Sequence, residues 1–256
     1  MAFWRLKPGS GKTETACDPR RADYAVFDQV SLKRGDKTVL DGLNLTLSER
    51  RIALIGLNGS GKSSFVRLLN GLLLPDSGSL QIYGADTRQA RANLPRHVGF
   101  VFQNPDHQAI FPTVEEEIAF GLTQLGQPRQ DARPNARRFL EAHGCAHLAE
   151  RPFLDLSEGQ KQLICILAVL VMQPGLIVFD EPFSSLDGLA TRQIMSLIRG
   201  LEQKLIMVSH DLELIRDFDR VLWLQDGQIR MDGEPGAVLP AYVDDIERRA
   251  AVSGLL

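Results

Sequence analysis

Short apolar stretches separated by turn residues fill the first part of the chain. Apolar side chains recur in residues 25–32, 38–47 and 51–55, and the triplet Arg34-Gly35-Asp36 separates the first two stretches. Short apolar runs bounded by turn residues are typical of β-strands. The sequence therefore predicts a β-rich N-terminal segment.

Farther along, helical patterns and short apolar strands alternate. Leucine and phenylalanine recur at helical spacing within residues 63–74, and residues 176–179 are a short apolar run of the buried, parallel-strand kind. Residues 113–150 show helical patterns. This order predicts an α/β fold with an inserted α-helical subdomain at about residues 104–172. The expected strands are 79–83, 97–102, 176–179, 205–208, 221–225 and 228–231, and the expected helices are 63–74, 114–122, 133–142, 158–172, 189–201 and 212–218.

Composition and charge are ordinary for a globular protein, with 44% hydrophobic residues, 24% charged residues and a formal net charge of −3. Because there is no overall basic field, we expect no nucleic-acid partner. The three cysteines are scattered and odd in number, which indicates a reducing compartment. A membrane span needs about 20 mostly apolar residues. The longest uncharged run is interrupted by Pro174 and Gly175, so a membrane role would require a partner.

A complete phosphate-binding motif follows the strand predicted at 51–55. Gly56 to Ser63 reads G-x-x-x-x-G-K-S, and a predicted helix begins at Ser63. The glycines let backbone N–H groups converge on phosphate oxygens, and the helix N-terminus faces the same anion. Lys62 would add a positive charge at the β- and γ-phosphates, and the Ser63 hydroxyl would be a ligand of Mg²⁺. We therefore predict a P-loop NTPase whose ATP-binding residues include Asn58, Gly59, Ser60, Gly61, Lys62, Ser63 and Ser64.

Two acids close the apolar strand predicted at 176–179. Asp180 and Glu181 would lie at the carboxyl edge of the sheet, where α/β proteins bind their ligands. In P-loop proteins an aspartate at this place reaches the Mg²⁺ shell. A glutamate beside it would be suited to polarise a water for in-line attack on the γ-phosphate. The spacing predicts Asp180 as a metal ligand and Glu181 as the catalytic base.

A third motif distinguishes between the families that share these two. Leu156-Ser157-Glu158-Gly159-Gln160 resembles the L-S-G-G-Q signature of ABC ATPases. Gln103 resembles the family's Q-loop glutamine, Asp187 its D-loop aspartate and His210 its switch histidine. The resemblance covers about residues 24–232. It implies a mixed RecA-like core with an N-terminal antiparallel β subdomain and an inserted α-helical subdomain.

The resemblance also implies a mechanism that needs two copies of the domain. In the family, two domains pair head to tail, and ATP bound at Lys62 and Ser63 of one is enclosed by the signature of the other. Glu181 would act on the water, His210 would contact the γ-phosphate and Glu181, and Gln103 would sense Mg²⁺. All these groups are present in one chain, which favours a homodimer. The residues expected to act in trans are Ser157, Glu158, Gly159 and Gln160.

Two positions depart from the family pattern. Glu158 replaces the usual glycine of the signature, and a carboxylate that pointed toward ATP would be repelled. We expect it to point outward, and we expect a Glu158→Gly variant to hydrolyse ATP at least as well. Arg34 stands where the family commonly has an aromatic residue that stacks on adenine. Its guanidinium plane could stack on the base, or it could be an ordinary exposed loop arginine.

One branch of the family resembles the chain in a further segment. The run from Gln103 to Gly121 is similar to the F-Q-N-P-D-x-Q-x-F-x-P-T-V-E-E-D-x-A-F-G segment of energy-coupling-factor (ECF) transporter ATPases. Those ATPases drive uptake of vitamins or of cobalt and nickel. The resemblance implies a transmembrane coupling (T) protein and a substrate-binding membrane (S) protein as partners. It also implies a peripheral location on the cytoplasmic face of the bacterial inner membrane.

The same segment contains a candidate docking surface for the membrane partner. Residues 110–112 are apolar, and residues 115–117 are acids that could face arginines of a coupling helix or simply favour a helix start. The short stretch after His210 favours the biotin-transporter ATPases, with cobalt or nickel transport as the alternative and a non-transport ABC ATPase as a third. We expect a flexible extension at 1–22, an ABC ATPase domain at 23–235 and a short helical tail at 236–256.

Overall fold

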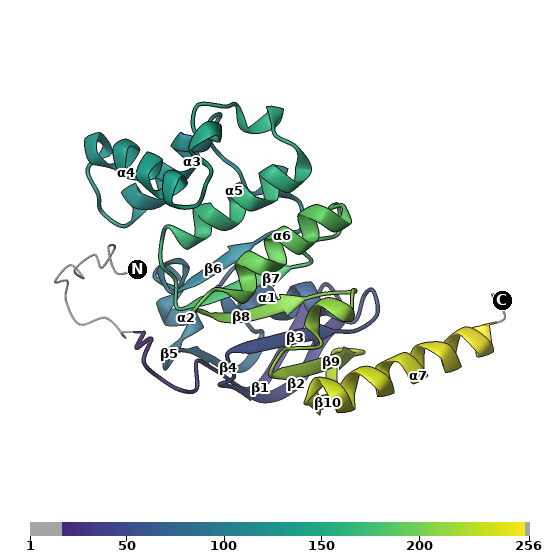
Figure 1. Cartoon of the computed structure of the whole chain (residues 1–256). Coiled ribbons are helices and arrows are strands. Elements are labelled where there is room, and N and C mark those ends of the chain that lie inside the picture. Colours follow the sequence, from purple (N-terminus) through teal and green to yellow (C-terminus); the bar gives the residue numbers. More distant parts are fainter. Residues whose placement is uncertain (1–16, 254–256) are drawn as a thin grey trace.

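The computed structural model describes residues 17–253 as two β-sheets with helices packed around them (Figure 1). The antiparallel sheet has the order β2-β1-β4-β5, and the six-stranded sheet has the order β10-β9-β3-β8-β7-β6. In the second sheet only β10 runs antiparallel to its neighbour among the described strands. The strands are β1 (Ala25–Arg34), β2 (Lys37–Leu47), β3 (Arg51–Ile55), β4 (Ser77–Ile82), β5 (Ala85–Asp86), β6 (Val98–Val101), β7 (Leu176–Asp180), β8 (Lys204–Val208), β9 (Arg220–Gln225) and β10 (Gln228–Gly233).

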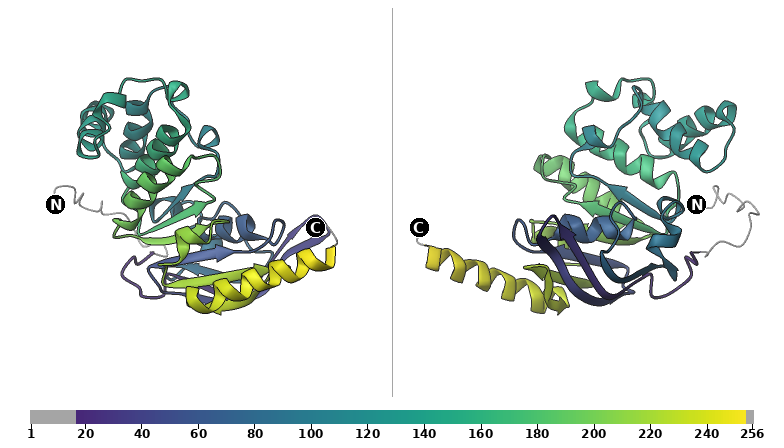
Figure 2. Two further views of the ribbon diagram at one scale, coloured as in Figure 1. Left: turned by 45° about the vertical axis from the view of Figure 1, so that its right-hand side comes forward. Right: turned by 180° about the vertical axis from the view of Figure 1, so that it is seen from behind.

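The arrangement confirms the predicted α/β fold of the ABC ATPase type. The antiparallel sheet comes first in the chain, the mixed sheet forms the core, and a group of helices is inserted between β6 and β7 (Figures 1 and 2). Figure 2 also shows the last helix projecting beyond the sheets. The helices are α1 (Lys62–Leu69), α2 (Thr87–Ala90), α3 (Val114–Gln124), α4 (Arg129–Ala142), α5 (Glu158–Leu170), α6 (Gly188–Arg199) and α7 (Pro235–Ser253).

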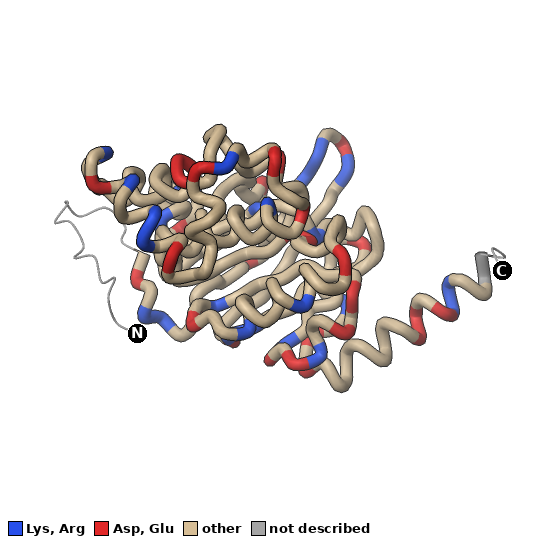
Figure 3. Tube along the Cα trace, turned by 45° about the horizontal axis from the view of Figure 1, so that its top comes forward, with Lys and Arg blue, Asp and Glu red and all other residues tan. Residues whose placement is uncertain are grey.

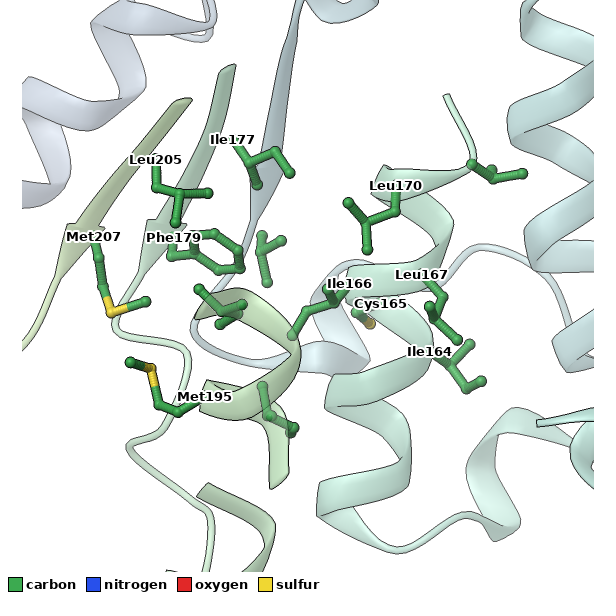
Figure 4. Packing of buried hydrophobic residues seen from close by; sticks show 14 of the residues in the cluster. Ile164, Cys165, Ile166, Leu167, Leu170, Ile177, Phe179, Met195, Leu205 and Met207 are labelled. Atoms are coloured by element: carbon green, nitrogen blue, oxygen red, sulfur yellow. The ribbon is translucent and has the colours of Figure 1, made fainter. Parts of the chain in front are cut away.

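The central strands divide their side chains between two hydrophobic clusters. Leu54 of β3 belongs to the cluster that includes Phe65 of α1 and the antiparallel sheet, and the next residue, Ile55, belongs to the opposite cluster. Successive strand residues point to opposite faces, so both faces of the mixed sheet are covered. Figure 4 shows the second cluster, in which Ile166 of α5 and Phe179 of β7 take part. Burial on both faces fixes the carboxyl ends of β3 and β7, where the predicted site residues lie.

Two predicted helices are much shorter in the structure. The helix predicted at 63–74 ends at Leu69, because the Asn70 side chain accepts a hydrogen bond from Leu72 N and Gly71 has a left-handed φ of +74°. The helix predicted at 212–218 is reduced to one 3₁₀ turn at Glu213–Ile215. Helical spacing of apolar residues over two turns did not distinguish an α-helix from this turn.

The predicted N-terminal extension falls partly outside the described residues. Residues 1–16 are not described, and neither are 254–256 at the end of the predicted tail. Inside the described range, Asp18 N donates to Tyr83 O at 3.0 Å, and Lys204 Nζ donates to the carbonyls of Arg21 and Ala22. The chain is therefore attached to the fold before the predicted boundary at residue 23. From residue 17 to 253, no helix combines the length and apolar character needed to cross a membrane.

Candidate functional site

Two glycines of the loop at 56–63, Gly56 and Gly61, sit where a side chain would not fit. Gly56 has φ +150°, and a Cβ there would lie 2.1 Å from Leu224 O. Gly61 has φ +108° and is the N-cap of α1, and a Cβ there would lie 2.9 Å from Val39 O. Without a side chain at these two glycines, the loop can turn tightly between β3 and α1, as loops that bind phosphate with their backbone N–H groups do. The geometry is that of a phosphate cradle.

Lys62 is buried at the start of α1. Its Nζ donates to the carbonyls of Gly56 at 2.9 Å and Leu57 at 3.2 Å. Burial lowers the pKa of Lys62, and the nearby carboxylates of Glu181 and Asp180 oppose that shift. An ammonium held in a partly desolvated loop interacts more strongly with an anion than one in water.

Asp180 ends β7 directly beside α1. Ser63 Oγ donates to Asp180 Oδ1 at 3.2 Å, and Arg67 lies 3.9 Å from the other carboxylate oxygen. Asp180 is only 4% exposed, and desolvation raises its pKa, an effect that the Ser63 hydrogen bond and Arg67 oppose. A hydroxyl and a desolvated carboxylate are hard oxygen donors of the type that Mg²⁺ prefers. The pair therefore fits the predicted metal ligands.

Glu181 is held by contacts on both sides of its carboxylate. His210 Nε2 lies 2.9 Å from Oε1, and Gln103 Nε2 donates to Oε2 at 3.3 Å. The backbone of Glu181 has φ +53°, which a non-glycine residue rarely adopts, and its N–H donates to Val208 O. The structure thus brings together three predicted residues from the ends of β6, β7 and β8.

A cleft of about 490 Å³ extends from Ser63 and Asp180 to the inserted helices. Its lining includes Ser63, Gln103, Asp180 and Glu158, so one residue of the signature borders the same cleft as the metal-ligand pair. No hydrogen bond or ion pair joins residues 157–160 to the loop 56–63 in the part of the chain that the structure describes.

The signature begins helix α5 with a complete capping box. Ser157 Oγ accepts from Gln160 N at 3.3 Å, and Gln160 Oε1 accepts from Ser157 N at 3.1 Å. This reciprocal pair fixes the first turn of α5. The predicted trans residues are therefore rigidly placed at a helix N-terminus, where anions bind favourably.

The predicted D-loop residue has a structural partner in its own chain. Asp187 is the N-cap of α6 and accepts from Leu189 N at 2.9 Å and Ala190 N at 2.8 Å. Ala190 in turn touches the signature, since a Cβ on Gly159 would lie 2.9 Å from Ala190 Cβ. Gly159 is thus required for the close packing of α5 on α6, independently of any role toward a ligand.

The two departures from the family pattern have different surroundings. Glu158 was expected to point outward; its side chain is 49% exposed, and its carboxylate accepts a hydrogen bond from Lys161 Nζ at 3.2 Å. Arg34 is exposed at the end of β1 and pairs in register with Lys37 of β2. The same hairpin carries Val39, whose carbonyl packs against Gly61. The β-hairpin therefore lies beside the phosphate loop.

The acids of the candidate docking surface have intramolecular partners. Glu117 is buried and accepts from Ile110 N and Phe111 N, both at 2.9 Å. Glu115 is buried against Arg137, and Glu116 pairs with Arg133. The acids thus hold the apolar loop and α4 in place. These contacts favour a role within the chain at the start of α3. Figure 3 shows that positive and negative residues are interspersed along the trace.

Several contributing residues were not predicted from the sequence. Arg67 faces Asp180, Lys161 faces Glu158, and Gln108 bridges Phe102 N and Cys165 O at 3.0 and 2.9 Å. Helical spacing could have revealed Arg67, four residues after Ser63, and Lys161, three residues after Glu158. The Gln108 contacts span the inserted helices, and no local pattern indicates them.

Known proteins are similar to the chain over most of its length. Residues 40–184 match the family described as ABC transporter. The chain is 46% identical to the biotin transport ATP-binding protein BioM of Rhodobacter capsulatus over 84% of this chain and 92% of that protein. It is 40% identical to the cobalt import ATP-binding protein CbiO of Syntrophus aciditrophicus over 80% of this chain and 75% of that protein.

A solved structure has the same architecture. CbiO1 of Clostridium perfringens, described as part of the ABC transporter complex CbiONQ, superposes with a TM-score of 0.76. It is 28% identical and matches 90% of this chain and 95% of its own. The two sheets and the inserted helices are therefore shared with a known protein of this architecture.

Proposed function

The chain belongs to the ABC transporter ATPases, and from that premise we propose that it is the energy-coupling subunit of an ECF-type importer. It is an ATP-hydrolysing transporter subunit, as its relatives and motifs show. The finer proposal is uptake of a vitamin, with biotin favoured, by a peripheral ATPase on the cytoplasmic face of the bacterial inner membrane. The observation that carries the enzymatic part is the carboxylate of Glu181, held between His210 and Gln103 at the end of β7.

The proposed chemistry uses the residues around the phosphate loop. Loop amides and Lys62 bind the phosphates of ATP, and Ser63 and Asp180, with Gln103 nearby, would hold Mg²⁺. The metal ion would neutralise charge on the phosphate oxygens. Glu181 orients and polarises the attacking water, and His210 keeps the carboxylate in place.

We propose that the working unit is a homodimer. The signature residues 157–160 begin a rigid, capped helix, yet they make no polar contact with the phosphate loop among the described residues. A second copy of the chain can supply the same helix end to the γ-phosphate. Binding of ATP would then close the pair, and hydrolysis would allow it to open.

A membrane partner of the T type is proposed to dock on the inserted helices. Ile110 is 70% exposed, although its backbone is fixed by Glu117. A hollow of about 310 Å³ lies nearby between α3 and α4, and its lining includes Phe111 and Phe120, whose rings are tilted by 40° with centroids 5.1 Å apart. An exposed apolar side chain on a fixed loop beside a hollow is suited to a protein contact. The S protein would reach the ATPase only through this partner.

The choice of solute depends on the relatives. The match to this chain covers 92% of the length of a biotin transport ATPase and 75% of the length of a cobalt import ATPase. The better coverage favours biotin, and cobalt or nickel remains the second candidate. The ATPase does not contact the solute in this scheme, so its own residues do not discriminate between the two.

Reconstituted transport tests the proposal. The chain is co-expressed with a T and an S protein, and ATP-dependent uptake of labelled biotin and of cobalt or nickel is measured in vesicles. Biotin uptake that is abolished by Lys62→Ala supports the proposal, and uptake of a metal ion alone replaces biotin with the second candidate. Normal ATP turnover by Lys62→Ala, or stable recovery with DNA or RNA and no membrane protein, would overturn it.

A further inference from the structure

A buried lysine lies behind the altered position of the signature. Lys161 is only 7% exposed, and its Nζ lies 2.9 Å from Asp106 and 3.2 Å from Glu158. Its backbone N–H donates to Ser157 O at 2.8 Å, which fixes its place in the first turn of α5. One ammonium therefore joins two carboxylates from two different segments. Its pKa is raised, chiefly by the hydrogen bond to Asp106.

Asp106 belongs to the segment that carries Gln103. The 3₁₀ turn Pro105–His107 follows Gln103 closely, and its Pro105 carbonyl accepts from Cys165 Sγ at 3.7 Å. Gln108 then ties the end of β6 to the backbone of α5 through Phe102 N and Cys165 O. The turn is thus attached to the signature helix at several points. Lys161 is the charged contact among them, and its position does not depend on Glu158 alone.

We propose that Lys161 is a positioning residue that holds the Glu158 carboxylate back from the N-terminal end of α5. The proposal rests on the proposed function, in which that helix end meets the γ-phosphate of ATP bound to a second copy. Glu158 is the first residue of α5, and an unpaired carboxylate there would compete with a phosphate for the same amides and repel it. Pairing with Lys161 directs the carboxylate along the helix toward the cleft instead.

This pair explains how a signature with glutamate in the place of glycine can remain competent. The usual glycine has no side chain to restrain, so the neighbouring lysine is not needed for that purpose. In this chain the Glu158 carboxylate is half exposed, and it needs a partner such as Lys161 to hold it away from the end of α5. A substitution that keeps the charge but shortens the side chain should therefore be more harmful than one that removes the charge.

The test measures the ATP concentration at which the full-length chain forms dimers. Each variant is made together with Glu181→Gln, which slows hydrolysis, and dimer formation is followed by light scattering. Glu158→Asp withdraws the carboxylate by one methylene from Lys161, and we expect the midpoint to rise about tenfold, which corresponds to about 1.4 kcal/mol. Glu158→Gln and Glu158→Gly should give midpoints at or below that of the parent. These changes affect a half-exposed side chain, so the fold is retained.

A second set of variants tests Lys161 directly. Lys161→Met should raise the midpoint at least tenfold, and adding Glu158→Gly should bring it back to within about twofold of Glu158→Gly alone. Equal midpoints for Glu158→Asp and the parent would overturn the proposal. So would a Lys161→Met defect that persists with Glu158→Gly and is relieved by Asp106→Asn, because Lys161 would then act only on the turn at Asp106. Absence of any ATP-dependent dimer in the Glu181→Gln parent would instead contradict the proposed function.

Discussion

The imidazole Nε2 of His210 lies 2.9 Å from Oε1 of Glu181, and this contact joins the ends of β8 and β7 at the phosphate loop. Glu181 adopts its position with φ +53°, a conformation that costs a non-glycine residue about 1–3 kcal/mol. The contacts of its carboxylate with His210 and Gln103 offset part of that cost. Strain at the residue proposed to act on water is consistent with a site whose geometry is set before ATP binds.

Replacing the carboxylate of Glu181 should separate binding from hydrolysis. Glu181→Gln keeps the size of the side chain and can still contact His210, but it is a poor base. We expect steady-state ATP turnover to fall at least about 100-fold, the lower end for loss of a general base, while ATP binding is retained. Turnover is measured as phosphate release, and binding with a fluorescent ATP analogue. Glu213→Gln, an exposed glutamate paired with Arg216, is the control and should retain normal turnover.

The buried carboxylate of Asp180 should lower the stability of the folded chain at neutral pH. The proposed metal binding requires this carboxylate. Its pKa is raised by desolvation, so the ionised form is less favourable in the folded than in the unfolded chain. The penalty is therefore absent at low pH, where Asp180 is protonated in both states, and it develops as the pH rises above the usual carboxyl range near about 4. Asp180→Asn should raise the melting temperature at pH 7, by about 2–4 °C for each kcal/mol regained.

The stability gain should be accompanied by a loss of ligand binding. Asp180→Asn should abolish the thermal shift that Mg²⁺ and ATP give to the parent protein. The gain should also shrink as the melts are repeated toward pH 4. Asp217→Asn removes a carboxylate from an exposed pair with Arg199 and should change the melting temperature little. A lower melting temperature for Asp180→Asn at pH 7 would contradict the prediction.

The positions of residues that belong to contiguous motifs could be predicted from the sequence. The loop at 56–63 and the acids after β7 occur in fixed local contexts, and buried strands place them together at one sheet edge. The Gln108 bridge and the Lys161–Asp106 ion pair were not predicted, because they join segments far apart in the chain. The acids 115–117 allowed two interpretations from the sequence, and only their contacts within the chain favour the internal one.

Packing within its own chain should restrict position 159 to glycine. A Cβ at Gly159 would lie 2.9 Å from Ala190 Cβ, so Gly159→Ala must push α5 away from α6. We expect a loss of stability of about 1–3 kcal/mol, as for other overpacked sites, measured by urea unfolding. Ala190→Gly in the same chain should restore most of it. Gly236→Ala is the matched control, since Gly236 is also the second residue of a helix and its added Cβ meets nothing. Equal losses of stability for Gly159→Ala and Gly236→Ala would show that packing against α6 does not cause the loss at position 159.

Arg34 should determine how strongly the site prefers adenine. It ends β1 on the hairpin that packs against the phosphate loop. Arg34→Tyr restores a ring of the kind common in the family, and stacking should lower the KM for ATP about fivefold, equivalent to about 1 kcal/mol. Lys33→Tyr is the control, because adjacent strand residues point to opposite faces. Hydrolysis of ATP and GTP is compared for each variant. An unchanged KM for Arg34→Tyr would place the side chain away from the base.

Ile110 should matter to the membrane partner and not to ATP hydrolysis by the isolated chain. Its side chain is 70% exposed, and its backbone is held by Glu117, so Ile110→Ser removes apolar contact without disturbing the loop. If Ile110 is a central contact of the interface, its truncation should weaken binding by about 2 kcal/mol, or roughly 30-fold. Co-purification with the T protein from detergent measures that loss, and phosphate release by the isolated chain measures hydrolysis. Leu72→Ser, at a 45% exposed leucine just after α1, controls for loss of surface apolar area. Recovery of the complex at parental yield with Ile110→Ser would show that this loop is not part of the interface. A side chain that a partner buries cannot be truncated without weakening the complex.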